Sequence, residues 1–122
     1  MPFASIELYA PFHHDLQTEA ATLVHTNHAA YLHSHVDMIT VKSTYVQPDE
    51  IWFFKGVQLD RDLEPAFYIH TVIGSGTATS VDIVKFVLST HDQLGSVFER
   101  LFPGVRMDDV PSRSKVTVTT TL

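Results

Sequence analysis

The amino-acid sequence predicts an α+β fold in which two β-α-β units form one four-stranded sheet, with two helices on one face and a short extra hairpin strand. Segments with apolar residues at every second position alternate with segments whose apolar residues recur every three or four positions. These segments follow the order strand, helix, strand twice, and a proline, Pro2 or Pro65, stands before each repeat. The 122 residues are therefore predicted to form a single domain, with halves at about 2–58 and 65–122.

The first half contains two main strands, one helix and one short strand. Their predicted positions are 3–10 (strand), about 15–34 (helix), 39–46 (strand) and 51–54 (short hairpin strand), followed by a polar connection over 56–64. Pro11 ends the first strand because proline has no N–H to donate to a neighbouring strand. Asp15 is the predicted N-cap of the helix, since its side-chain oxygens can accept hydrogen bonds from the free N–H groups there.

The second half repeats this pattern. Its predicted elements are a strand over 66–73, a helix from Thr79 or Ser80 to about 102, and a threonine-rich strand over 115–122. The helix is predicted from apolar residues at i, i+3, i+4 and i+7, and Asp82 lies in its first turn, where a negative charge is favourable. Gly74-Ser75-Gly76 before this helix and Pro103-Gly104 after it mark turns.

The predicted sheet has one face without helices. Parallel strands need a crossover connection, and each predicted helix supplies one. Because both helices would cover the same face, the other face would expose tyrosine, valine and isoleucine side chains to water unless copies of the chain associate. We therefore expect an oligomer. A ferredoxin-like arrangement has the same order of elements, so this order leaves the two folds open.

The composition excludes several classes of protein. The formal net charge is -6 and the 8 lysines and arginines do not cluster, so neither nucleic acid nor an anionic membrane is an expected partner. The absence of cysteine excludes a disulfide scaffold, a thiolate metal site and a cysteine nucleophile. The N-terminal residues lack the basic and apolar regions of a signal peptide, and no apolar run reaches the ~20 residues of a membrane span, which predicts a cytoplasmic location.

Histidine is frequent, with 8 residues in the chain. His25 and His28 are three positions apart on the first predicted helix, a spacing that can hold a metal ion. We expect both to flank the polar side of a surface helix, and the chain has no His-Glu-x-x-His motif. The sequence therefore predicts no physiological metal ion and no cofactor.

Ordered signals in the centre of the chain resemble a known family. They are Val-Gln-Pro-Asp-Glu at 46–50, Phe-Lys-Gly at 54–56, Pro-Ala at 65–66 and Ile-Gly at 73–74. Their spacing, with a proline directly after the initiator methionine, resembles the macrophage migration inhibitory factor branch of the tautomerase superfamily. The chain length and Ile73-Gly74-Ser75-Gly76 resemble 5-carboxymethyl-2-hydroxymuconate isomerase. The resemblance covers nearly all of the chain and implies a tautomerase-like fold that assembles into trimers or hexamers, of which we expect a homotrimer.

The same resemblance implies a role for Pro2. In this superfamily the initiator methionine is removed, which leaves a proline with a free secondary amine, and the enzymes move protons between oxygen and carbon of 2-keto acids and their enols. An apolar pocket lowers the pKa of an amine towards neutrality, where the amine can act as a general base. Aromatic residues that can form such a pocket are Tyr45, Trp52 and Phe54. The predicted function is therefore a tautomerase or isomerase acting on a small 2-keto acid.

A substrate carboxylate requires a cation. Lys42 matches the place where several tautomerases carry an arginine, and it keeps a point charge without the paired donors of arginine. His13 and His14, at the first strand-to-helix turn, are further candidates. Thr77 stands where the hydroxymuconate isomerases carry an arginine, which argues against a dicarboxylate substrate.

Two alternatives stay open. The same fold can hydrate, dehalogenate or decarboxylate a small unsaturated acid with a protonated Pro2 as the acid, although the paired arginines expected for that chemistry are missing. The other alternative is a non-enzymatic, ferredoxin-like oligomeric module that binds an apolar ligand, in which Pro2 has no catalytic role.

Overall fold

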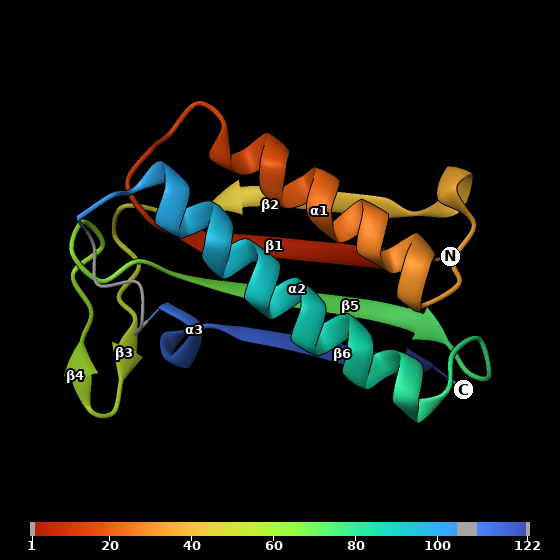
Figure 1. Cartoon of the computed structure of the whole chain (residues 1–122). Helices are drawn as coiled ribbons and strands as arrows, with labels where there is room; N and C mark the ends of the chain where they lie inside the picture. The colour runs from red at the N-terminus through yellow and green to blue at the C-terminus, as the bar shows by residue number, and fades with distance from the viewer. Residues whose placement is uncertain (1, 105–109, 122) are drawn as a thin grey trace.

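Two layers make up the structure: a four-stranded sheet and, packed on one of its faces, two long helices (Figure 1). The computed structural model describes residues 2–104 and 110–121. In chain order the elements are β1 (Phe3–Tyr9), α1 (Leu16–Tyr31), the 3-10 helix η1 (Val36–Met38), β2 (Thr40–Tyr45), β3 (Phe53–Phe54), β4 (Val57–Gln58), β5 (Ala66–Gly74), α2 (Ser80–Leu101), α3 (Val110–Arg113) and β6 (Lys115–Thr121). This architecture confirms the predicted α+β fold.

The strands are ordered β2-β1-β5-β6 in the sheet. β1 pairs with β2 in parallel, and β5 pairs with β6 in parallel, so the two strands of each half are neighbours. The halves meet in the centre through the antiparallel pair of β1 and β5, in which Ile6 lies opposite Ile69. In a ferredoxin-like sheet, another strand separates the two strands of each β-α-β unit. The observed pairing therefore excludes that alternative fold.

The hydrophobic core lies between the helices and the sheet. Alternate residues of β1 point towards the helices, and Ala4, Ile6 and Leu8 are buried there. From the other side, the ring of Phe98 in α2 lies 5.6 Å from the ring of Phe67 in β5. This packing fixes where each strand begins and ends, and it thereby positions the loops at the two ends of the sheet.

The two long helices begin in different ways. Thr79 and Asp82 form a reciprocal capping box at the start of α2, in which the Asp82 N–H donates to Thr79 Oγ1 at 3.2 Å and the Thr79 N–H donates to the Asp82 carboxylate at 3.0 Å. This pair confirms Thr79 as the cap. Asp15 occupies the N-cap position of α1 as predicted, but its side chain makes no capping hydrogen bond and lies 3.3 Å from His14 Nε2 instead.

The first helix ends at Tyr31, earlier than the predicted end at about 34. Leu32 is its C-cap, and the next residue, His33, has a φ of 58°. A residue in the left-handed region cannot continue a right-handed helix, so the chain leaves the helix here and enters the connection to η1. The sequence predicted neither η1 nor α3.

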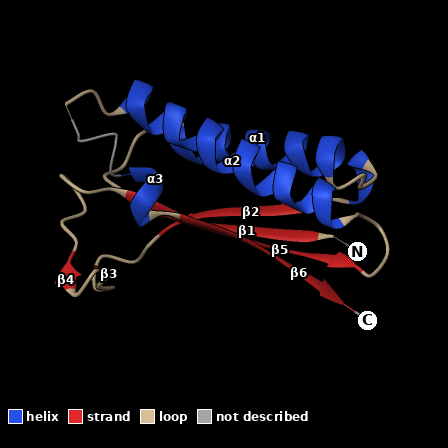
Figure 2. Cartoon of the chain, turned by 60° about the horizontal axis from the view of Figure 1, so that its bottom comes forward, coloured by secondary structure: helices blue, strands red, loops and turns tan. Residues whose placement is uncertain are grey.

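The predicted short strand forms a hairpin at one end of the sheet. It is shorter than predicted, Phe53–Phe54 instead of 51–54, and its partner β4 lies inside the segment predicted to be a polar connection. Lys55 and Gly56 between them have φ values of 52° and 77°, as a tight hairpin turn requires. The hairpin stands at the end of the sheet where β1 and β2 finish, away from the N-terminus (Figure 2).

One face of the sheet carries no helix in the described chain (Figure 2). The side chains of Tyr68 and Val72 in β5 lie on this open face, so the prediction for tyrosine and valine is correct. The prediction for isoleucine is wrong, because the alternation of β5 places Ile69 and Ile73 in the core. No helix in the described ranges is both long and apolar enough to cross a membrane.

Candidate active site

A cavity of about 350 Å³ lies beside Pro2, at the end of the sheet where β1 begins and β5 finishes. Three segments line it: the residue before β1, the connection from α1 to β2, and the connection from β5 to α2. Its lining residues are Pro2, His33, Ser34, His35, Met38, Ile73, Gly74 and Thr77. The cavity therefore brings the first residue of the described chain together with two loops that follow it by more than 30 and more than 70 positions.

Pro2 is half-buried and held by its backbone. Its carbonyl oxygen accepts a hydrogen bond from the Thr40 N–H at 3.2 Å, at the start of the pairing between β1 and β2. Met38 and Ile73 give the cavity an apolar part next to this proline. The position of Pro2 is thus set by the sheet and not by a free terminal segment.

Two histidines, His33 and His35, form part of the cavity wall. His33, in the left-handed conformation, places its Nε2 atom 3.2 Å from the carboxylate of Asp82 at the start of α2. The Nδ1 atom of His35 accepts a hydrogen bond from the Asp37 N–H at 3.4 Å. Histidine is the side chain that gains a positive charge most readily near neutral pH, so this wall can present charge to an anionic ligand. The sequence interpretation did not select either residue.

A third histidine lies directly behind this wall. His28 is fully buried in α1, which corrects the prediction that it flanks the polar side of a surface helix. Its Nδ1 atom is 2.7 Å from Ser34 Oγ, and its Nε2 atom is 2.6 Å from Thr71 Oγ1. Burial, and secondarily the charge of His25, lowers the pKa of His28, so the ring is held in its neutral form.

A sequence signal for this burial exists. Leu16, Ala20 and Val24 are buried residues of α1 spaced by four positions, and His28 is the next in the series. Residues four apart lie on one face of a helix. The apolar face of α1 therefore includes His28, and only its polar side chain concealed this in the sequence.

Known structures identify the architecture around this cavity. The sequence matches no protein-family model and no curated protein. The structure is similar to N1, a member of the cis-3-chloroacrylic acid dehalogenase family, with a TM-score of 0.71 and 12% identity over 98% of this chain and 74% of that chain. A symmetric trimer of fused 4-OT has a TM-score of 0.73 and 5% identity, over 98% of this chain and 85% of that chain. The chain has a tautomerase-like fold.

A further similarity supports this fold and also limits what the fold says about function. Macrophage migration inhibitory factor of Toxoplasma gondii has a TM-score of 0.65 and 19% identity, over 98% of this chain and 89% of that chain. The tautomerase-like fold is thus shared by proteins with different names and activities. The function of this chain therefore has to be argued from the residues of its own cavity.

The tautomerase-like fold places Lys42 away from the cavity. Lys42 lies on β2 opposite Ser5 of β1. Its neighbour Val41 packs into the core, so the alternation of the strand directs Lys42 to the open face. Within one chain, Lys42 is not among the described residues that line the cavity. Its predicted role as a carboxylate ligand stays a prediction.

The predicted ligands His13 and His14 lie at the far end of the sheet from Pro2. They follow β1, a strand of 7 residues, which separates them from Pro2 by roughly 20 Å. Tyr45 at the end of β2 joins them: its hydroxyl accepts from the His13 N–H at 3.0 Å and donates to the His13 carbonyl at 2.9 Å. The structure therefore brings His13 and Tyr45 together, but at a distance from Pro2.

The predicted aromatic residues Trp52 and Phe54 belong to the same far end. Trp52 stacks on Tyr9, with ring centroids 5.1 Å apart, and Phe54 packs against the same cluster. A cavity of about 400 Å³ adjoins this cluster and is lined in part by Arg61. The Arg61 guanidinium donates to the carbonyls of Val46 and Gln47, each at 2.7 Å, so its charge is engaged within the chain. The smaller cavity is the better candidate site because Pro2, the residue that the resemblance implicates as the base, lines it.

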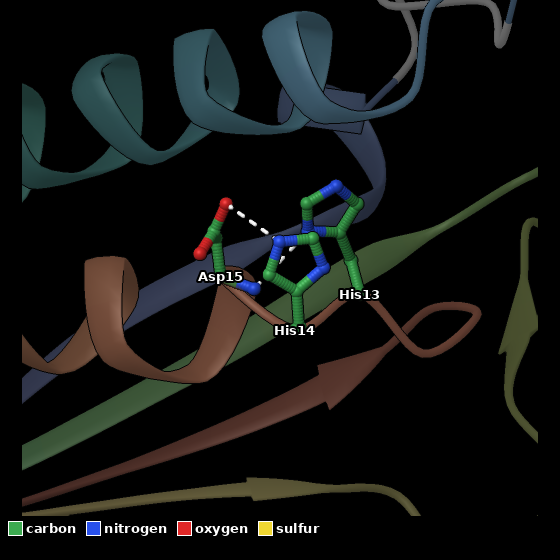
Figure 3. Close-up of side chains that lie close together, drawn as sticks. All are labelled: His13, His14 and Asp15. Atoms are coloured by element: carbon green, nitrogen blue, oxygen red, sulfur yellow. Dashed lines mark hydrogen bonds and ion pairs between the residues drawn. The ribbon is translucent and has the colours of Figure 1, made fainter.

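His13, His14 and Asp15 form a compact cluster at the start of α1 (Figure 3). Their ligand atoms lie within 4.8 Å of one another. The Nδ1 atom of His13 already accepts a hydrogen bond from the Asp15 N–H at 3.1 Å, and His14 and Asp15 are exposed. The start of a helix is also unfavourable for a cation. The arrangement does not argue for a metal centre.

Proposed function

We propose that this chain is a tautomerase that moves a proton between the enol and keto forms of a small 2-keto acid, with Pro2 as the general base. The observation that carries the proposal is that Pro2 lines a cavity whose wall also includes apolar residues and two histidines. A volume of about 350 Å³ suits a small molecule.

The proposed reaction requires that Met1 be removed, so that Pro2 carries a secondary amine. The apolar side chains of Met38 and Ile73 favour the neutral form of this amine, because a charged group loses hydration beside them. The neutral amine removes the proton of the enol hydroxyl while the oxygen forms the carbonyl bond. The resulting ammonium group of Pro2 then delivers a proton to the adjacent carbon, which restores the free amine.

The carboxylate of the substrate is held, in this proposal, by the histidine wall of the cavity. His33 and His35 can donate charge-assisted hydrogen bonds to an anion when they are protonated. Lys42, His13 and His14 lie outside this cavity in a single chain, so they can contribute only if a second copy carries them to it.

We propose a homotrimer for the assembly. Phe3 and Val72 form an apolar pair on the open face, where they lie opposite each other in the pairing of β1 with β5, and Tyr68 lies on the same face four residues before Val72. Phe3 is 43% exposed in the single chain. Association would remove this apolar surface from water, and the fused 4-OT with the same fold is a symmetric trimer.

The proposed activity is tested by the ketonisation of enol phenylpyruvate, followed by absorbance. Mass spectrometry first verifies that Met1 is absent from the sample. We expect a rate above that of buffer alone, and we expect Pro2→Ala to lower it at least about tenfold, since a positioned general base typically contributes about 10²–10⁴-fold. Pro65→Ala is the matched control, because Pro65 precedes β5 as Pro2 precedes β1 but does not line the cavity.

Other results would contradict the proposal or favour one of the two alternatives. A rate that is equal in Pro2→Ala and in the wild type would contradict the role of Pro2. Turnover of a 3-haloacrylate without ketonisation would favour the dehalogenation alternative, a reaction class named for the similar protein N1. Tight binding of an apolar ligand without any turnover would favour the non-enzymatic alternative.

A further inference from the structure

We infer that His28 and Thr71 form a hydrogen-bonded pair that positions Pro2: with Ser34, the pair connects the cavity wall to the backbone next to Pro2. This inference rests on the proposed function, since it assigns His28 a part in the same site. His28 is fully buried and does not line the cavity, so it acts through other residues and does not contact the substrate.

The donor and the acceptor can be assigned for each hydrogen bond of His28. The Thr71 hydroxyl donates to the carbonyl oxygen of Phe3 at 3.1 Å, so its proton is already used. Thr71 Oγ1 therefore accepts from Nε2–H of His28, and Nδ1 of the neutral ring accepts from the Ser34 hydroxyl. Both ring nitrogens are engaged. The order of the chain is Ser34, His28, Thr71 and the Phe3 carbonyl.

Both ends of this chain lie at the proposed site. Ser34 lines the cavity between its two histidines, and Phe3 is the residue after Pro2. The Pro2 carbonyl is held separately by the Thr40 N–H. Phe3 is paired with Val72 in the sheet, and the Thr71 hydroxyl adds a side-chain hydrogen bond to its carbonyl oxygen. A displacement of about 1 Å in a catalytic group can lower a rate up to ~100-fold, so the anchoring of Phe3 matters for a base at Pro2.

A core histidine calls for an explanation because an apolar residue would satisfy the packing there. His28 meets the ring of Phe86 edge-on, with centroids 5.7 Å apart, and follows three apolar residues of the same helix face. A buried polar group destabilises a protein unless it is hydrogen-bonded. Here the hydrogen bonds run to the two segments that form the site, which is the arrangement that a positioning role requires.

The adjacent residue provides a comparison within the same helix. Asn27 is also buried, and its side chain donates to Thr90 Oγ1 at 3.1 Å and to Gln93 Oε1 at 3.0 Å. These bonds join α1 to α2 and reach no residue that lines the cavity. Thr71 and Thr90 are therefore matched: both are fully buried threonines bonded to α1, but only Thr71 leads to Pro2.

The test compares Thr71→Val, Thr71→Ser and Thr90→Val in the full chain. Steady-state ketonisation of enol phenylpyruvate gives kcat and KM, and thermal unfolding gives Tm. We expect Thr71→Val to lower kcat about tenfold with little change in KM, and Thr71→Ser to restore the wild-type value because it keeps the hydroxyl. Thr90→Val should lower Tm by a similar amount and leave kcat unchanged.

A second readout does not depend on activity. In protein labelled with 15N-proline, an NMR titration reports the pKa of the Pro2 amine directly. We expect Thr71→Val, but not Thr90→Val, to move this pKa towards that of a free peptide amine, because Pro2 would leave its place beside the cavity wall. This measurement tests the inference even if the wild type does not ketonise enol phenylpyruvate, a result that would count against the proposed function alone.

Two outcomes would overturn the inference. One is an equal effect of Thr71→Val and Thr90→Val on kcat and on the Pro2 signal, which would make the network merely structural. The other is a Thr71→Ser variant as impaired as Thr71→Val, which would show that the hydroxyl is not the group that matters.

Discussion

His28 shows at the level of one residue how burial determines the charge of a side chain. The ring has no exposed surface, and burial lowers its pKa, with a further contribution from the charge of His25 three positions earlier. The neutral ring can make both of its hydrogen bonds, because one ring nitrogen donates to Thr71 and the other accepts from Ser34. The protonated ring would have two donors and no acceptor for the Ser34 hydroxyl.

The lowered pKa of His28 predicts a pH dependence of stability. In the unfolded chain His28 takes up a proton near its ordinary pKa of 6.5, whereas the folded protein resists this until the pH is lower. The unfolded state therefore binds more protons in this window, so the free energy of unfolding falls as the pH decreases through it. Urea unfolding at about pH 5 and about pH 7.5 measures the change.

Two variants isolate the contribution of His28. His28→Gln removes the titrating ring, and its free energy of unfolding should change less between the two pH values than that of the wild type. His14→Gln removes an exposed histidine at the start of α1 and should keep the wild-type dependence. A His28→Gln variant with the full pH dependence would contradict the prediction.

At the scale of elements, α1 and α2 begin differently, and this predicts that substitutions at their N-caps change the free energy of unfolding by different amounts. The pKa of Asp82 is lowered below its ordinary value, as expected for a formed capping box. The hydrogen bond from the Thr79 backbone N–H contributes most, and the hydrogen bond with the Thr79 side chain contributes next. Thr79→Ala should lower the free energy of unfolding by about 1 kcal/mol, because it removes the acceptor for the Asp82 N–H.

Asp15→Ala is the matched change at α1. Asp15 makes no capping hydrogen bond, so we expect a loss below about 0.5 kcal/mol, from the weakened interaction with the helix dipole and the lost, exposed contact with His14. Urea unfolding at neutral pH measures both variants. Equal losses would mean that Asp15 caps α1 in solution.

At the scale of the whole molecule, the open face of the sheet predicts the assembly. Val72→Arg places a charge directly opposite Phe3 in the apolar pair of the open face, where burial of an unpaired charge in an interface is unfavourable. We expect light scattering to give about three times the chain mass of 13.7 kDa for the wild type and the mass of one chain for this variant.

A control for the assembly lies on the opposite side of the molecule. Leu88 in α2 is 64% exposed and faces away from the sheet, so Leu88→Arg should leave the mass unchanged. Dissociation by Leu88→Arg but not by Val72→Arg would place the interface on the helix layer and contradict the proposed use of the open face.

The elements of this fold were accessible from local patterns in the sequence. The β-forming residues of 66–73 and the threonine-rich segment 115–122 predicted β5 and β6 almost to the residue, with Leu122 of the predicted last strand outside the described residues. Helical spacing and the Thr79 cap predicted α2. These features depend on neighbours a few positions apart, so a linear sequence contains them. The end of α1 was placed too late because no glycine or proline marks it, and the left-handed turn is made by His33, a residue that seldom adopts this conformation.

The sequence by itself determined the two β-α-β units and the presence of a proline at the start of the first. Only the tertiary structure decided that β1 and β5 pair in the centre, that His33 and His35 line the same cavity as Pro2, and that His28 is buried. Lys42, Tyr45 and Trp52 were selected for their chemistry, and the sheet then separated them from Pro2 within one chain. The reason is physical: the cavity is formed by segments far apart in sequence, whose meeting depends on strand order and core packing and on no local pattern.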